Sequence, residues 1–374
     1  MQRRALLAAV AAAVALPSQP LRAAAGVAVP AARPARRVEI MGHRGCSALR
    51  PEHTLASYAK AVFDGADFIE PDLVCTRDGV LVVRHENEIG ATTDIAQRPE
   101  FAARRKSVTI DGQQETGWFA SDLTLAELKT LRARERIPQV RPDSALFDGR
   151  FQVLTFDEVI DFAAALSATL GRDIGLIPEL KHSTFFASIG LPLEERLLQT
   201  LAAHDYTRRA PLVVQSFEVA NLMALRERLG RPANVRLMQL TGDPRMVPAD
   251  IAAAGGTRRY AELTSAAGLA ELARHVDIVA PPIPVLIPWD ANGRLQAPAD
   301  IIRDAHAVGL QVHTWTFRPE NQFMAADFRN ADGPNVRNVA GSVAEIRNMI
   351  AAGIDGFFTD DPAIGRLAAG QAGG

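Results

Sequence analysis

The sequence has little cysteine, little net charge and few long apolar runs, and each of these absences excludes a class of protein. Its 374 residues include only two cysteines, so a CxxC-type metal site is excluded. The formal net charge is −2, which argues against a basic face and against a nucleic-acid partner. Beyond the N-terminus there is no apolar run of transmembrane length and no internal repeat. The composition is otherwise typical of a globular protein with a large core.

The N-terminus predicts a signal peptide, residues 1–25. Arg3 and Arg4 precede an apolar run at residues 5–16 that contains no acid and is followed by small residues. This run is too short to span a bilayer comfortably. An N-terminal core helix is the alternative interpretation. The Pro- and Ala-rich linker at residues 26–37 favours a leader instead, so we expect an exported protein, either periplasmic or secreted.

Short apolar runs alternate with helical patterns along the rest of the chain. Strands are predicted at residues 38–42, 67–72, 174–180, 212–216, 235–239, 277–280, 311–316 and 356–359. Helices are predicted at residues 54–64, 156–170, 193–204, 219–229, 266–275, 298–308 and 343–352. Continuous apolar strands are typical of parallel sheets that are buried on both faces. Eight such strands alternating with helices predict an α/β fold, a (β/α)8 TIM barrel, over residues 38–370.

One segment breaks this alternation. Residues 81–85 follow the second strand too closely for a parallel crossover, and an Asp-Gly turn signal lies between them. We therefore expect an antiparallel β-hairpin extension that brings His85 back towards the end of the second strand. The next segment, residues 86–150, has little periodicity beyond a helix predicted at 125–134. We interpret it as an insertion after strand 2, on the active face of the barrel.

Three carboxylates lie at predicted strand ends, where barrel enzymes place their chemistry. Glu70 and Asp72 are two residues apart and so point to the same face, on either side of Pro71, which cannot donate to a sheet. Glu179 and Lys181 repeat this pattern on the third strand. Carboxylates gathered at one barrel mouth would repel one another, and a hard divalent cation would relieve that repulsion. For any one of these acids alone, a surface ion pair is the alternative interpretation.

Basic residues flank these carboxylates. His43 ends the first strand and His85 ends the return strand, and we interpret them as an acid/base pair because histidine carries protons near neutral pH. Arg44 can donate two hydrogen bonds to phosphate oxygens, and Gly45 leaves room for a close approach. Glu52 is expected to orient Arg44 or another basic group. This set of side chains is typical of metal-assisted attack on a phosphate ester.

Other residues near strand ends carry weaker signals. Phe217 and Trp315 are placed where they can line a substrate-binding wall, although aromatic residues at such positions often belong to a core. His53 is either a helix-start residue without chemical function or a member of the site. Asp360 and Asp361 close the last strand, and we interpret them as a helix cap or as support for active-site residues.

Five short motifs in a fixed order resemble those of a known family. They are His43-Arg44-Gly45, Pro51-Glu52-His53-Thr54, Glu70-Pro71-Asp72, Arg84-His85-Glu86 and Pro178-Glu179-Leu180-Lys181. The set resembles the glycerophosphodiester phosphodiesterases, specifically their periplasmic or secreted branch, from residue 38 to about residue 362. The resemblance implies hydrolysis of glycerophosphodiesters to sn-glycerol 3-phosphate and an alcohol. It also implies one divalent cation as cofactor, with Ca²⁺ favoured and Mg²⁺ as the alternative.

The resemblance assigns roles to individual residues. It makes Glu70, Asp72 and Glu179 the metal ligands, and His43 and His85 the acid/base pair. Arg44 and Lys181 match groups near the phosphate, and Glu52 matches an acid beside the arginine. Glu86 stands where many family members have aspartate, so the resemblance leaves its role undefined.

Two other functions stay open at this point. A lysophospholipase D-type phosphodiesterase shares this barrel and catalytic pattern, but it would want an apolar rim that residues 86–150 do not provide. A secreted binding protein could keep the fold without turnover, although every catalytic motif is retained here. The expected partner is a small-molecule glycerophosphodiester. The sequence does not define its alcohol group or the oligomeric state of the chain.

The two cysteines allow one disulfide in an oxidising compartment. Cys46 lies three residues beyond His43, and Cys75 lies three residues beyond Asp72. Because these residues end neighbouring strands, the two loops are expected to meet at the rim of the site. A Cys46–Cys75 disulfide is therefore predicted, with two unpaired cysteines as the alternative.

Overall fold

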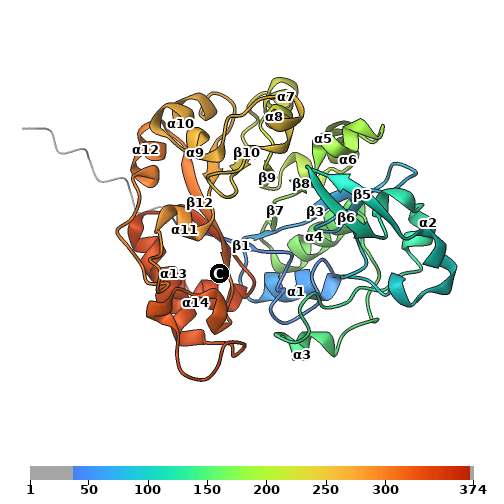
Figure 1. Cartoon of the computed structure of the whole chain (residues 1–374), viewed down its shortest axis with the longest axis horizontal. Helices are drawn as coiled ribbons and strands as arrows, with labels where there is room; N and C mark the ends of the chain where they lie inside the picture. Colours follow the sequence, from blue (N-terminus) through green and yellow to red (C-terminus); the bar gives the residue numbers. More distant parts are fainter. Residues whose placement is uncertain (1–36, 371–374) are drawn as a thin grey trace, which may run out of the picture. The chain divides into compact units, whose positions relative to one another are not determined.

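The computed structural model describes residues 37–370, and its centre is a closed barrel of parallel strands (Figure 1). The predicted signal peptide and almost all of the linker lie outside the described residues. Each barrel strand pairs with the next in a ring, and β13 closes on β1. The strands of the ring are β1 (Glu39–Gly42), β2 (Phe68–Ile69), β7 (Gly175–Leu176), β9 (Leu212–Ser216), β10 (Val235–Leu240), β11 (Ile278–Ala280), β12 (Gln311–Phe317) and β13 (Gly356–Thr359). The predicted (β/α)8 barrel is confirmed.

Two prolines shape the second and third barrel strands. Pro71 follows β2 and Pro178 follows β7 closely, and because proline has no N–H to donate, both ladders are interrupted there. Pairing resumes beyond the prolines, with Asp72 opposite Glu179, and a further strand returns antiparallel as predicted. These outer strands are β3 (Asp72–Cys75), β8 (Glu179–Leu180) and β4 (Leu81–Val83).

Helices surround the barrel, and most begin and end within three residues of the predicted bounds. The longer helices are α1 (Leu55–Phe63), α4 (Phe156–Leu170), α6 (Leu193–Ala203), α7 (Ala220–Leu229), α10 (Ala266–Leu272), α12 (Ile301–Ala307), α13 (Val339–Ala352) and α14 (Pro362–Ala369). Shorter ones are α5 (Ser183–Ser188), α8 (Ala249–Ala253), α9 (Tyr260–Leu263) and α11 (Ile283–Leu286). The predicted start of the helix at 343–352 is wrong. The helix α13 begins four residues earlier, at Val339, where Asn338 caps it by accepting a hydrogen bond from the Gly341 amide.

The segment 86–150 has more structure than its weak periodicity indicated. It contains an antiparallel pair, β5 (Lys106–Ile110) and β6 (Gln113–Gly117), and the short helices α2 (Leu125–Leu128) and α3 (Pro142–Ala145). Thr124 caps α2 through a capping box, but the helix is shorter than the predicted 125–134. It stops because the chain beyond it becomes extended, with bridges from Arg132 to Gln152 and from Ala133 to Thr93.

The barrel interior is a small apolar layer, separate from the larger core between strands and helices. On β1, Ile40 faces the helices whereas Met41 faces inwards, and on β13 Phe357 and Phe358 alternate in the same way. The inner layer consists of Met41, Phe68, Ile177, Val213, Met238, Leu240, Ile278, Ala280 and Phe358. On each strand, the next inward-facing residue beyond this layer therefore faces the mouth of the barrel.

The predicted Cys46–Cys75 disulfide is wrong in this structure, where both cysteines are buried free thiols. The loop after His43 folds back onto α1, with the Cys46 amide donating to the Ser57 carbonyl at 3.0 Å. Strand β3 instead carries Cys75 away from the site, by roughly 10 Å over three extended residues. Within residues 37–370, no helix combines the length and the apolar character that crossing a membrane requires.

Candidate active site

The inward-facing positions of the barrel strands place the predicted site residues together at the mouth. His43 lies two residues beyond the inward-facing Met41, and Glu70 lies two residues beyond Phe68. A cavity of about 60 Å³ opens there. It is lined by His43, Arg44, Glu70, His85, Glu179, Gln215, Phe217, Leu240, Trp315, Thr316, Arg318 and Phe358. Strand alternation thus puts polar side chains directly above the apolar interior of the barrel.

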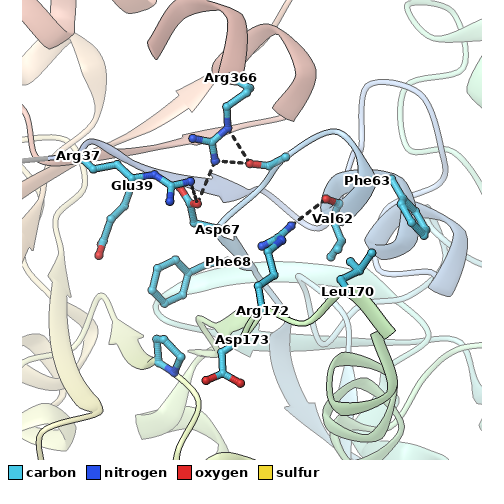
Figure 2. A pocket seen from close by; sticks show the side chains of 12 residues that line it. Arg37, Glu39, Val62, Phe63, Asp67, Phe68, Leu170, Arg172, Asp173 and Arg366 are labelled. Atoms are coloured by element: carbon cyan, nitrogen blue, oxygen red, sulfur yellow. Dashed lines mark hydrogen bonds and ion pairs between the residues drawn. The ribbon is translucent and has the colours of Figure 1, made fainter. Parts of the chain in front are cut away.

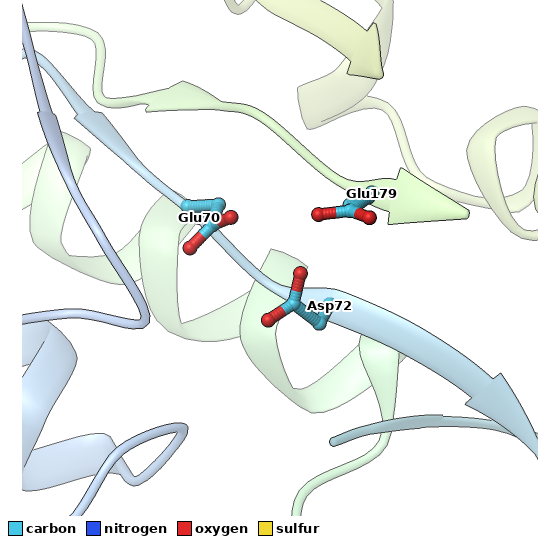
Figure 3. A group of neighbouring side chains, drawn as sticks. All are labelled: Glu70, Asp72 and Glu179. Atoms are coloured by element: carbon cyan, nitrogen blue, oxygen red, sulfur yellow. The ribbon is translucent and has the colours of Figure 1, made fainter. Parts of the chain in front are cut away.

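Three buried carboxylates face one another beside this cavity. One oxygen from each of Glu70, Asp72 and Glu179 lies within 4.8 Å of the others. Figure 3 shows Glu70 and Asp72 projecting from one stretch of chain towards Glu179 on the neighbouring strand. The predicted convergence of the three acids at one mouth is confirmed.

The surroundings of this cluster neutralise it only in part. Glu70 accepts from the Arg44 amide at 2.7 Å, and the Glu179–Lys181 ion pair spans 2.8 Å. Burial, followed by the negative charge of Asp72, still raises the pKa of Glu70 well above its ordinary value. Burial also raises the pKa of Glu179 to about 8, against the opposing charge of Lys181. Three carboxylates held this close in the interior are unfavourable by themselves.

The cluster fits a hard divalent cation. All of its ligand atoms are oxygens, as Ca²⁺ and Mg²⁺ prefer. The Oδ1 atom of Asp72 is buried without a hydrogen-bond partner. Burial opposes ionisation of Asp72, but the positive charge of Lys181 and the hydrogen bond with His53 help to hold its pKa well below the ordinary value. An ionised oxygen that lacks a donor is suited to bind a cation.

Each predicted catalytic histidine is backed by a carboxylate. His43 Nδ1 lies 2.6 Å from Asp360 Oδ1, so Asp360 supports an active-site residue, one of the two roles predicted for it. His85 Nδ1 contacts Glu86, and His85 Nε2 lies 3.2 Å from Lys181 Nζ. Burial and then the positive charge of Arg44 lower the pKa of His43 to about 4 and that of His85 to about 3. Both imidazoles are therefore neutral near pH 7 before substrate binds.

Arg44 is held rigidly at the cavity. Its Nη1 atom donates to Glu52 at 3.0 Å, and Glu52 also accepts from Arg136, so this acid contacts both Arg44 and another basic group. Arg44 itself adopts a left-handed conformation, with φ +56°. The close approach at Gly45 is made by α1, because a Cβ there would lie 2.4 Å from the Ser57 hydroxyl.

His53 belongs to the site rather than only to a helix start. It is fully buried, with Nε2 2.9 Å from Asp72 Oδ2 and Nδ1 2.8 Å from the Tyr58 hydroxyl. It therefore orients one of the three carboxylates. Asp361, in contrast, caps α14 by accepting from the Ile364 amide, which is the other role predicted for this pair of aspartates.

The two predicted aromatic residues line the cavity. The rings of Phe217 and Trp315 meet edge to face with centroids 5.6 Å apart. Lys181 Nζ lies 5.6 Å from the centroid of the Phe217 ring, within range of a cation–π contact. Together the two rings form an apolar wall of the cavity, and Lys181 lies against this wall.

Polar residues to which the sequence assigned no role also contact the site, among them Gln215, Arg136 and Arg141. Gln215 donates to Glu70 at 3.2 Å. Because Val213 and Phe217 lie two residues to either side and face inwards, strand alternation could have predicted that Gln215 also faces the site. Arg136 and Arg141 reach the site from the insertion. No periodic signal in that segment could have identified these two arginines.

Comparisons with known proteins define the class of this protein. Residues 43–364 match the Glycerophosphoryl diester phosphodiesterase family. A glycerophosphodiester phosphodiesterase of Arabidopsis thaliana is 34% identical over 336 residues, covering 86% of this chain and 82% of that protein. One of Treponema pallidum is 28% identical over 299 residues, covering 75% of this chain and 81% of the relative. The chain belongs to the glycerophosphoryl diester phosphodiesterase family. It is an enzyme, a phosphoric diester hydrolase of that family.

Solved structures share the fold. An Oleispira antarctica phosphodiesterase in complex with the product sn-glycerol-3-phosphate superposes with a TM-score of 0.55 at 18% identity, over 89% of this chain and 97% of that chain. A glycerophosphoryl diester phosphodiesterase from Parabacteroides distasonis gives a TM-score of 0.51 at 16% identity, over 90% of this chain and 87% of that chain. At these identities the likeness supports the barrel itself.

Proposed function

We propose that this enzyme hydrolyses glycerophosphodiesters to sn-glycerol 3-phosphate and an alcohol, using a divalent cation and a pair of histidines. The observation that carries the proposal is one cavity lined by two carboxylate-backed histidines and by members of a buried three-carboxylate cluster. The names of the relatives support the same substrate class. Membership of the periplasmic or secreted branch, with export through residues 1–25, is part of the proposal and rests on the sequence alone.

Glu70, Asp72 and Glu179 would hold the cation. When bound, it would neutralise these carboxylates and offset negative charge on the phosphate oxygens. The all-oxygen ligand set suits both Ca²⁺ and Mg²⁺. Ca²⁺ is favoured by the extracytoplasmic location that we propose, with Mg²⁺ as the alternative.

The side chains of the cavity bind the phosphate, exclude water and transfer protons. Arg44 and Lys181 hold the phosphate, and the Phe217–Trp315 wall excludes water from the organic part of the substrate. The Nε2 atom of one histidine takes the proton from the attacking hydroxyl while the P–O bond to the alcohol breaks. The other histidine, protonated as the anionic substrate raises its pKa, gives its proton to the leaving alkoxide. The attacking hydroxyl is water, or the glycerol 2-hydroxyl with a cyclic phosphate that water then opens.

A substrate panel tests this function. Glycerophosphocholine, glycerophosphoethanolamine and a lysophospholipid are each incubated with the enzyme in Ca²⁺, in Mg²⁺ and in excess chelator. We expect glycerol 3-phosphate from the first two substrates, only when metal is present. Faster cleavage of the lysophospholipid would favour the lysophospholipase D-type alternative. Absence of glycerol 3-phosphate under every condition would contradict the proposal.

A further inference from the structure

Both histidines of the proposed acid/base pair depend on carboxylates that lie outside the three-carboxylate cluster. His43 Nδ1 meets Asp360, and His85 Nδ1 meets Glu86. An imidazole that donates its Nδ1–H to a carboxylate carries its lone pair on Nε2, which in His85 faces Lys181 Nζ at 3.2 Å. Asp360 and Glu86 therefore decide which nitrogen of each histidine is left for proton transfer.

Each of these two carboxylates is held by an arginine from the insertion. Arg136 donates from Nη1 and Nη2 to the two oxygens of Glu86, at 2.8 and 2.6 Å. Arg141 donates from Nη2 to Asp360 Oδ2 at 2.6 Å. One short turn of the chain, residues 135–141, thus reaches the partners of both histidines. We call this segment the arginine turn.

The arginine turn is itself well anchored. The buried side chain of Glu135 accepts from the Ile137 amide at 3.0 Å and from the Ser144 hydroxyl at 2.6 Å. The Arg141 amide donates back to the Ile137 carbonyl at 2.9 Å, which closes the turn. Both guanidinium groups are therefore presented by a backbone that is held at several points.

The two arginines differ in what else they contact. Arg136 also donates two hydrogen bonds to Glu52, at 2.9 and 2.6 Å, and Glu52 in turn holds Arg44. The other partners of Arg141 are Glu320, at 2.7 and 3.2 Å, and the Ser47 carbonyl at 2.9 Å. Arg136 is thus linked through Glu86 to His85 and through Glu52 to Arg44. Arg141 is linked through Asp360 to His43 but has no such link to Arg44.

We propose that Arg136 and Arg141 are positioning residues through which the insertion aligns both histidines for proton transfer. The proposal rests on the roles proposed above for His43 and His85. Arg136 holds both oxygens of Glu86 with a guanidinium fork, which fixes that carboxylate in one plane. Arg141 places its fork on Glu320, and this fixes the Nη2 atom that donates to Asp360 Oδ2. The single ammonium of lysine can do neither. When the carboxylate is free to turn, the imidazole that it supports turns with it. A displacement of this kind costs catalysis because reacting groups must be aligned within a fraction of an ångström.

The first test replaces each arginine by lysine, which keeps the charge and removes the fork. Arg141→Lys is expected to lower kcat about 10- to 100-fold and leave KM within about twofold. Arg136→Lys is expected to lower kcat similarly and also to raise KM, because Glu52 loses its support for Arg44. The matched control is Arg134→Lys, because Arg134 borders the turn and contacts only Asp148 among the acids, at 3.3 Å. The control should change neither parameter.

A double-mutant cycle then shows whether each arginine acts through its histidine. In a His43→Ala background, Arg141→Lys should cost little further activity, and Arg136→Lys should behave in the same way with His85→Ala. If the losses multiply, or if both lysine variants keep wild-type kcat, the proposal is overturned. Thermal unfolding checks that each variant is folded at the assay temperature. Should a lysine variant fail to fold, Asp360→Asn and Glu86→Gln replace it, and wild-type kcat in both would overturn the proposal.

The outcome is distinguishable from a failure of the proposed function itself. If His43→Ala and His85→Ala keep the wild-type rate, the acid/base pair is wrong and the arginines have nothing to position. If the histidine variants lose activity while the arginine variants do not, only the role of the arginine turn is wrong.

Discussion

The two ends of the barrel differ in whether their buried polar side chains have hydrogen-bond partners within the protein. This difference, more than cavity size, distinguishes the candidate active site. At the N-terminal ends of the strands lies a cavity of about 600 Å³, ten times the volume of the cavity at the mouth (Figure 2). A large pocket is the usual first hypothesis for a binding site. The charged side chains that line this cavity, however, form hydrogen bonds within the protein. Arg172 donates to the Val62 carbonyl at 3.0 Å, and Arg366 donates to Asp67 at 2.9 Å.

The mouth is smaller but contains polar atoms that the protein leaves unsatisfied. Asp72 Oδ1 and Gln215 Oε1 are buried without hydrogen-bond partners, and Glu70 and Glu179 have raised pKa values. A folded protein tolerates buried groups of this kind at the expense of stability, so a ligand that relieves them is expected there. Buried polar groups without hydrogen-bond partners, rather than cavity volume, therefore distinguish the end of the barrel that carries the candidate active site.

Metal removal is expected to have the largest effect and to act only at the mouth. Excess chelator should abolish turnover, and added Ca²⁺ or Mg²⁺ should restore it, because the three carboxylates repel one another without a cation. Glu179→Gln should weaken metal binding, measured by calorimetry. The control is Glu218→Gln, which alters a buried carboxylate held by the Thr184 amide at 3.0 Å, outside the cluster. Full activity in excess chelator would contradict the ligand assignment.

Loss of either histidine at the mouth should have the next largest effect. His43→Ala and His85→Ala are each expected to lower kcat at least about 10²-fold, the lower range for general acid–base catalysis. The double variant should lose less than the product of the two losses, because the groups act as a unit. His306, which pairs with Asp355 at 2.8 Å, is the matched control, and His306→Ala should keep kcat. A near-native kcat in one catalytic variant would remove that histidine from the mechanism.

Glu345 is a buried carboxylate that lines neither cavity, and it tests whether a raised pKa by itself indicates function. Burial raises the pKa of Glu345 on α13 to about 7, although it accepts from the Ala325 amide at 2.8 Å. Between its ordinary pKa and pH 7 the native state binds more protons than the unfolded state, so stability falls as pH rises.

Glu345→Gln removes this titration and keeps an oxygen for the amide. Its stability relative to wild type should therefore increase from pH 4.5 to pH 7, by at most about 3 kcal/mol, with kcat unchanged. Urea unfolding across this pH range measures the difference, with exposed Glu227→Gln as the control. A pH-independent difference would show that Glu345 titrates normally.

The smallest effect is expected at the large cavity. Arg172→Leu removes the donor to the Val62 and Ala66 carbonyls and should lower stability by about 1 kcal/mol, the net value of an ordinary hydrogen bond. The value of kcat/KM should stay the same, because nothing at the mouth changes. Arg303→Leu, at an exposed arginine, controls for loss of surface charge. A large fall in kcat/KM without unfolding would show that this cavity takes part in function.

The sequence by itself determined the barrel and most of the carboxylate cluster. Apolar runs of strand length recur between helical patterns, and β9, β13 and α4 have the predicted bounds. Glu70 and Asp72 share a face because side chains alternate along a strand, and this holds whatever the rest of the chain does. These features depend on local periodicity, which the sequence displays directly.

Only the tertiary structure decided which groups support the histidines. Arg136 meets Glu86 across 50 residues, and Arg141 meets Asp360 across 219 residues, from a segment without a strong period. Only the tertiary structure decided the state of the two cysteines as well. Their sequence positions predicted a disulfide, but the path of β3 carries Cys75 away from Cys46. Contacts of this kind depend on how loops pack after the barrel has closed. Local propensity does not encode that packing, because no repeating pattern links residues so far apart in the chain.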